Sequence, residues 1–149
     1  MAACLCSGAW VTDIRAPHSL HLDEESVVEL CYHARSAAPA DCARDARLAR
    51  VKPAHVVAMC AGAESTAPTE CFKTVRSTRL GVEDRVALCR RAPTVAPAEC
   101  ANAAPFSLSA QHVATLCAGA ASTQPSSCVA KIRSQRYVLR GATPYRCCR

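Results

Sequence analysis

Apolar residues recur along the chain at spacings of three and four, which is the period of an amphipathic helix. Before the first repeated cysteine, Val28, Leu30, Cys31 and Ala34 fall on one face of such a helix. The same pattern returns at Val57, Met59, Cys60 and Ala63. The chain is therefore expected to fold as a series of helices with one buried face each.

Eight cysteines divide this pattern into four copies of one unit. They form pairs eleven residues apart, and the first members of successive pairs are separated by 29, 29 and 28 residues. The pairs are Cys31 and Cys42, Cys60 and Cys71, Cys89 and Cys100, and Cys117 and Cys128. A proline stands three residues before each second cysteine: Pro39, Pro68, Pro97 and Pro125. A period in this range indicates a repeat architecture.

Each unit has the start signals of two helices. The first helix is expected to begin after an N-cap position eight residues before the first cysteine, held by Asp23, Lys52, Gly81 and Ser109. The second helix is expected to begin at the proline, and in three copies an acid (Asp41, Glu70, Glu99) follows two residues later, where it can accept from free backbone N–H groups. These signals predict an all-α fold, an array of about four helical hairpins.

The register assigns residues 22–50, 51–79, 80–107 and 108–135 to units 1 to 4. Residues 1–21 are interpreted as a degenerate unit or an irregular N-terminus, because Leu5 to Ala9 read LCSGA, close to the LCAGA around Cys117. Residues 136–149 form a basic tail, in which Cys147 is a possible trace of a further unit. The chain is thus read as a piece of a longer array, or as an array with decayed ends.

The composition predicts a core that is too thin to stabilise such a fold well, so that disulfide bonds would add useful stability. Of 149 residues, 30 are Ala and 12 are Cys, whereas aromatic residues make up only 4%. Small side chains bury little apolar area each, so a thin core is expected. No run approaches the roughly 20 apolar residues of a membrane span, so a transmembrane protein is excluded by this pattern.

The eight cysteines are expected to form disulfides, and the favoured pairing lies within each unit. In an antiparallel hairpin both cysteines of a pair stand about one turn from the loop, at the same height on facing helices. The expected bridges are Cys31–Cys42, Cys60–Cys71, Cys89–Cys100 and Cys117–Cys128, each contributing about 3 kcal/mol by loop entropy. A second pattern, which joins each second cysteine to the next first cysteine as in Cys42–Cys60, also connects helix ends at one height. The sequence leaves this connectivity open.

Metal binding and catalysis have weaker signals. No C-x2-C pair of the kind that zinc sites use is present. His55 and His112 recur before a first cysteine in only two copies, His33 occurs in one, and Cys147 with Cys148 forms an isolated vicinal pair. No common catalytic or nucleotide-binding motif occurs. We therefore expect no catalytic residue, no metal ligand and no cofactor.

The formal net charge of +6 lies entirely in the last third of the chain, where residues 100–149 contain no acid. Lys131, Arg133, Arg136 and Arg140 could give a weak, salt-sensitive contact with polyanions, since the three arginines share one face if the last helix continues. The alternative is that these residues keep an exposed terminal helix soluble and cap the array.

The units resemble Ala- and Cys-rich repeats of the form LC-x-GA…APxxC in uncharacterised large proteins of algae and oomycetes. The resemblance is carried by Leu88 to Ala92 with Ala96 to Cys100, and by Leu116 to Ala120 with Pro125 to Cys128. It spans roughly residues 22–135, favours an extracellular or secretory setting, and implies no activity and no functional residue.

Four equivalent units without a singular site favour a non-catalytic structural or binding module, with a protein or glycan as partner. Cysteine usage favours an extracellular location, although the first ten residues contain no recognisable signal peptide. Two alternatives stay open: a cytoplasmic helical-repeat scaffold whose reduced cysteines pack in the core, and a thiol-based metal or redox protein.

Overall fold

The computed structural model describes residues 22–135, and all regular secondary structure in that range is α-helical. The eight helices are α1 (Glu24–Cys31), α2 (Ala38–Leu48), α3 (Pro53–Cys60), α4 (Ala67–Thr74), α5 (Val82–Cys89), α6 (Ala96–Ala103), α7 (Ala110–Cys117) and α8 (Gln124–Gln135). Each unit of the sequence contains one odd-numbered and one even-numbered helix. The structure confirms the predicted all-α fold and its disulfide-stapled helical array.

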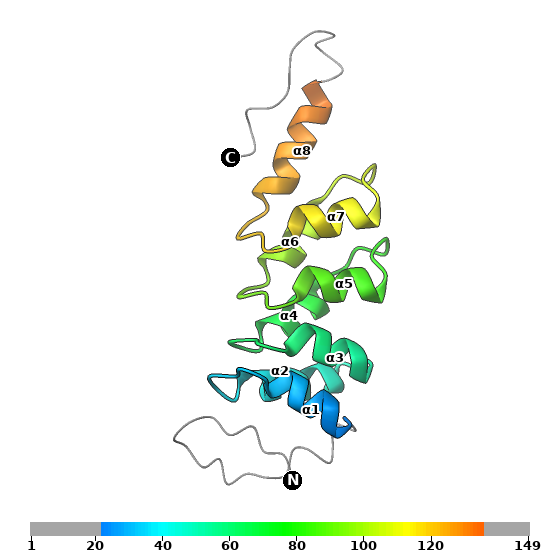
Figure 1. Cartoon of the computed structure of the whole chain (residues 1–149). Helices are drawn as coiled ribbons and strands as arrows, with labels where there is room; N and C mark the ends of the chain where they lie inside the picture. The colour runs from blue at the N-terminus through cyan, green and yellow to red at the C-terminus, as the bar shows by residue number, and fades with distance from the viewer. Residues whose placement is uncertain (1–21, 136–149) are drawn as a thin grey trace.

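The helices stack in two layers along one direction (Figure 1). The odd-numbered helices form one layer, in which α3 packs between α1 and α5, and α5 between α3 and α7. The even-numbered helices form the second layer in the same order. An open stack of this kind buries its core between successive units rather than around one centre.

The first helix of each unit begins where the sequence predicts. Asp23, Lys52, Gly81 and Ser109 are the N-caps of α1, α3, α5 and α7. The Asp23 carboxylate accepts a hydrogen bond from the backbone N–H of Ser26 at 2.8 Å, and this bond lowers the pKa of Asp23. Side-chain capping thus supports the starts of α1 and α7, whereas Lys52 and Gly81 make no side-chain cap and α3 begins at Pro53.

Each odd-numbered helix ends on the first cysteine of its unit and leaves through a tight turn. The N–H of the alanine three residues later donates to the cysteine carbonyl, as in Ala63 to Cys60 and Ala92 to Cys89 at 2.9 and 3.0 Å. The residue before that alanine has positive φ in all four units: His33, Gly62, Arg91 and Gly119. This is the pattern of a type II turn, which favours glycine at this position, and two of the four units have it.

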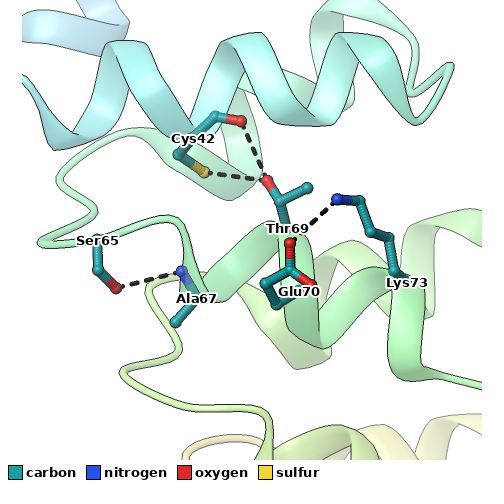
Figure 2. Close-up of polar contacts among 6 residues, drawn as sticks. All are labelled: Cys42, Ser65, Ala67, Thr69, Glu70 and Lys73. Atoms are coloured by element: carbon teal, nitrogen blue, oxygen red, sulfur yellow. Dashed lines mark hydrogen bonds and ion pairs between the residues drawn. The ribbon is translucent and has the colours of Figure 1, made fainter.

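The second helix of each unit begins one residue earlier than predicted, so that the proline occupies its second position. A hydroxyl six residues before each second cysteine explains the shift. Its oxygen accepts from the first N–H of the helix at 3.2 Å in all four units: Ser36, Ser65, Thr94 and Ser122 bind the N–H groups of Ala38, Ala67, Ala96 and Gln124. Figure 2 shows this bond for Ser65 and Ala67. Side-chain hydroxyls commonly organise turns in this way.

The acids after the prolines have a different partner from the one predicted. Asp41 accepts from Arg44 at 2.8 Å, and Glu70 accepts from Lys73 at 3.0 Å (Figure 2). Because the helix starts earlier, each acid lies one position further into the first turn, where a base three residues later is its neighbour. Both pairs are solvent-exposed and contribute little to stability.

The core is as thin as the composition predicts. Its largest fully buried apolar side chains include Leu30, Met59 and Leu88, and most of the remainder are Val, Ala and Cys. Six cysteines are completely buried: Cys42, Cys60, Cys71, Cys89, Cys100 and Cys117. The contacts between units therefore depend on small side chains and on sulfur.

Candidate functional site

Three disulfides cross the junctions between successive units. They are Cys42–Cys60 between units 1 and 2, Cys71–Cys89 between units 2 and 3, and Cys100–Cys117 between units 3 and 4. The Cα–Cα distance is 5.6 Å in each, which is ordinary for a disulfide. We call these three bridges the disulfide ladder.

The pairing within units, which the sequence analysis favoured, is wrong, and the second pattern is the one found. The bridges Cys60–Cys71 and Cys89–Cys100 do not form, since each of these residues pairs with a neighbouring unit. The reason is the packing of the helices: α2 contacts α3 more extensively than it contacts α1, and α4 and α6 likewise favour the helix that follows. The second cysteine of a unit therefore faces the next unit.

Cys31 and Cys128, the outermost cysteines of the four units, are also disulfide-bonded. Cys147 and Cys148, which the sequence analysis considered as a vicinal pair, lie outside the described residues. All eight cysteines of the repeated pattern are thus oxidised in the structure, although not in the expected pairs.

Two buried hydroxyls tie unit junctions together beside the ladder. Thr69 donates to the carbonyl oxygen of Cys42 at 3.0 Å, and its oxygen lies 3.5 Å from the Cys42 sulfur (Figure 2). Ser126 occupies the same position in unit 4 and donates to the Cys100 carbonyl at 2.6 Å. Both residues are fully buried. Unit 3 has Ala98 at this position, so the junction between units 2 and 3 lacks the equivalent hydroxyl.

That junction has a different polar contact, made by Arg79. Its guanidinium donates to the carbonyl oxygens of Ala104, Pro105 and Leu108 at 2.9 to 3.1 Å and lies over the Phe106 ring, 5.0 Å from its centre. These carbonyls belong to the segment that follows α6, where the chain leaves the helix. Arg79, at the end of unit 2, therefore satisfies backbone acceptors of the segment that joins unit 3 to unit 4.

Asn102 strengthens the same junction from the opposite side. Its side-chain oxygen accepts from the N–H of Arg76 at 2.8 Å, and its amide nitrogen donates to the carbonyl of Thr74 at 2.9 Å. The amide thus binds an acceptor in the last residue of α4 and a donor two residues later. Sequence reasoning missed Thr69, Ser126, Arg79 and Asn102, because each stands at a position where the units differ.

The candidate polyanion residues are described only in part. Lys131 and Arg133 lie on α8 and are exposed, and Arg133 donates to the hydroxyl of Ser107. Arg136 and Arg140 lie outside the described residues. The structure therefore does not test the proposed row of arginines.

Among residues 22–135, no three His, Cys, Asp or Glu side chains gather in a way that could hold a metal ion. His112 does contact a hydroxyl, with its Nδ1 atom 2.7 Å from the Ser109 oxygen, but that hydroxyl is the exposed N-cap of α7. The geometry is that of a helix start. Within the same range, no helix has the length and apolar character needed to cross a membrane.

Comparison of the chain with protein-family models, with curated proteins and with solved structures finds no match. The feature common to all junctions of the described stack is the disulfide ladder.

Proposed function

We propose that this chain is a non-catalytic structural module that works in an oxidising, extracellular setting. The observation that supports the proposal is the disulfide ladder, in which every junction between the four units has one covalent bridge. Disulfides form and persist mainly in secreted proteins and in oxidising compartments. A module built to keep its shape under such conditions needs covalent junctions more than it needs a large core.

The magnitude of the effect supports a structural role. Each bridge closes a loop of 17 or 18 residues, which corresponds to about 3 kcal/mol of loop entropy. The loops do not overlap, so their contributions add to about 9 kcal/mol. That sum is comparable with the whole stability of an ordinary domain. The folded array therefore depends on oxidation.

The test is the redox state of the protein isolated from its native source. The sample is alkylated during lysis, its intact mass is measured with and without reductant, and the bridged peptides are mapped. The proposal expects no alkylation of the eight repeated cysteines and recovery of the three bridges of the ladder. Eight alkylated thiols in a folded protein would support the cytoplasmic scaffold instead. One zinc ion per unit in the same sample would support a metal protein.

The partner of such a module is a protein or a glycan that contacts the side of the stack. A repeat array presents an extended surface because successive units turn only slightly relative to one another. The proposal therefore assigns function to the array as a whole rather than to one residue.

A further inference from the structure

A small cavity opens at the junction between units 2 and 3, between the turn that follows α3 and the turn that follows α5. Its volume is about 370 Å³, which lies in the lower part of the range of ligand pockets in proteins. The Cys71–Cys89 bridge joins the helices next to both turns, so the two walls are held together covalently. The lining residues are Gly62, Glu64 and Ser65 from unit 2, and Arg91, Ala92 and Pro93 from unit 3.

The Arg91 side chain is held against unit 2 by one of its nitrogens. Its Nε donates to the carbonyl oxygen of Ala61 at 3.0 Å, and it lies above Gly62, where an added Cβ would be 3.1 Å from that nitrogen. The hydrogen bonds that join Arg91 to other described residues use Nε and the backbone N–H. The two terminal nitrogens are therefore available to a ligand, and they present the planar pair of donors that matches a carboxylate.

Arg91 also has a backbone conformation that is unfavourable for residues with a side chain. Its φ is 53°, whereas units 2 and 4 have Gly62 and Gly119 at the equivalent position and unit 1 has His33. Left-handed conformations of this kind cost energy for residues other than glycine, and such strain is concentrated at functional sites. The hydrogen bond to Ala61 gives Arg91 a structural role as well, but that role uses Nε alone.

Glu64 and Ser65 add an acceptor and a donor to the opposite wall. The Glu64 side chain is exposed, and among the ion pairs of residues 22–135 none joins it to Arg91. The Ser65 oxygen accepts from the N–H of Ala67 at 3.2 Å, so its own proton can be donated to a ligand. A matching ligand therefore has a carboxylate for Arg91 and, close to it, hydroxyl groups for Glu64 and Ser65.

We propose that this cavity binds a hexuronic acid residue of a glycan, with its carboxylate on Arg91 and its ring hydroxyls toward Glu64 and Ser65. The inference rests on the proposed function and deepens it, because it gives the glycan partner of the module a contact point on the array. A sugar acid combines one carboxylate with several neighbouring hydroxyls. An acidic side chain of a peptide supplies the carboxylate without those donors, and a sulfate group supplies no donor for Glu64.

The experiment titrates the full, oxidised, isotope-labelled chain with D-galacturonate and follows the amide resonances around the cavity. A ligand of this size at ordinary ligand efficiency binds with a Kd of about 1 mM. D-galactose has the same ring hydroxyls without the carboxylate and is expected to bind about tenfold more weakly or worse, since the charge-assisted hydrogen bonds are lost. Absence of saturable shifts at galacturonate concentrations about tenfold above that Kd would overturn the inference, and so would equal binding of the two sugars.

Arg91→Gly tests the guanidinium itself, because glycine already occupies the equivalent position in units 2 and 4 and suits the positive φ. It is expected to weaken galacturonate binding by about tenfold or more and to leave galactose binding unchanged. Arg90→Ala is the matched control, since Arg90 is exposed and adjacent but does not line the cavity. Equal losses in the two variants would reduce the effect to net charge and overturn the site. Circular dichroism and disulfide mapping check that both variants fold.

A peptide carboxylate is distinguished from a sugar acid with N-acetyl-aspartate as a second probe. Glu64→Ala removes the acceptor for the ring hydroxyls and relieves the repulsion of either carboxylate equally. It is therefore expected to reduce the preference for galacturonate over N-acetyl-aspartate. Equal affinity of the wild type for both probes would assign the cavity to a peptide carboxylate and overturn the glycan. The readout is ligand binding by the oxidised chain, so its failure is separate from a failure of the thiol count that tests the proposed function.

Discussion

Two double variants of the ladder cysteines test the connectivity and its energetic value together. Cys71→Ala with Cys89→Ala removes both partners of one bridge. Cys60→Ala with Cys71→Ala removes one partner from each of two bridges and leaves Cys42 and Cys89 unpaired. Each double variant replaces two completely buried cysteines by alanine, so the loss of packing is closely matched between them.

The expected difference follows from the loop length. Each bridge closes 18 residues and contributes about 3 kcal/mol to the free energy of unfolding. The C71A/C89A protein loses one bridge and the C60A/C71A protein loses two. The second variant is therefore expected to be less stable than the first by about 3 kcal/mol. With a urea m-value of about 2 kcal/mol/M, its unfolding midpoint lies about 1.5 M lower.

The assay pairs urea unfolding, followed by circular dichroism, with alkylation of the denatured, unreduced proteins and intact mass measurement. We expect no additional alkylated thiol in C71A/C89A and two in C60A/C71A. Pairing within units would reverse both results, because C60A/C71A would then remove one complete bridge and C71A/C89A would leave two thiols. The reversed thiol count would refute the ladder even if the stabilities agreed.

Three further predictions concern turns, hydroxyls and a cap. Gly119→Ala is expected to lower the free energy of unfolding by about 1 kcal/mol through its positive φ alone, since an added Cβ meets nothing within 4 Å there. Gly62→Ala is expected to lower the free energy of unfolding by more than Gly119→Ala does, because its Cβ would lie 3.1 Å from the Arg91 side chain. Equal losses of the two variants in urea titrations would contradict this reasoning. Thr69→Val is expected to lower the free energy of unfolding by about 1 to 3 kcal/mol in the same titration, because it removes the donor to the Cys42 carbonyl. An unchanged free energy of unfolding would show that this hydrogen bond makes no net contribution to stability. Since the hydrogen bond from Ser26 lowers the pKa of Asp23 below the ordinary value of an aspartate, its stabilisation is present above that ordinary value and is lost as the pH falls through the lower, folded pKa. The unfolding midpoint of Asp23→Asn should therefore fall less in this acid range than that of the wild type, and equal slopes would argue against the assignment.

Local signals in the sequence predicted all eight helices, four of them with starts one residue too late, but they did not determine the cysteine pairing. Asp23 and Ser109 cap helices because the chemistry of an N-cap involves only the next three residues. The choice between Cys42–Cys31 and Cys42–Cys60 depends instead on how far α2 is displaced along the stack toward α3. Both pairings place helix ends at one height, and only packing against the following unit distinguishes them.

The polar contacts at the junctions escaped prediction for another reason. Features that all units share, such as the hydroxyl at Ser36 and Ser65, leave a signal in the repeated sequence. Thr69 and Arg79 bind backbone carbonyls 27 and about 26 residues away in the chain, at positions where the other units have different side chains. Such contacts are visible only once the units are stacked.

The position of the bridges also determines how the array responds to a pulling force along its length. Between Cys42 and Cys128, tension passes through each disulfide directly into the next unit, so the linkers and odd-numbered helices between bridged cysteines bear no load. Only three segments of eleven residues, 60–71, 89–100 and 117–128, are left to extend. At about 3.5 Å per extended residue, the oxidised stretch lengthens to roughly 130 Å, against roughly 300 Å after reduction. Bridges within units would instead have shielded segments 60–71, 89–100 and 117–128 from the force. With the bridges as they are, segments 42–60, 71–89 and 100–117 can extend only after the disulfides are reduced.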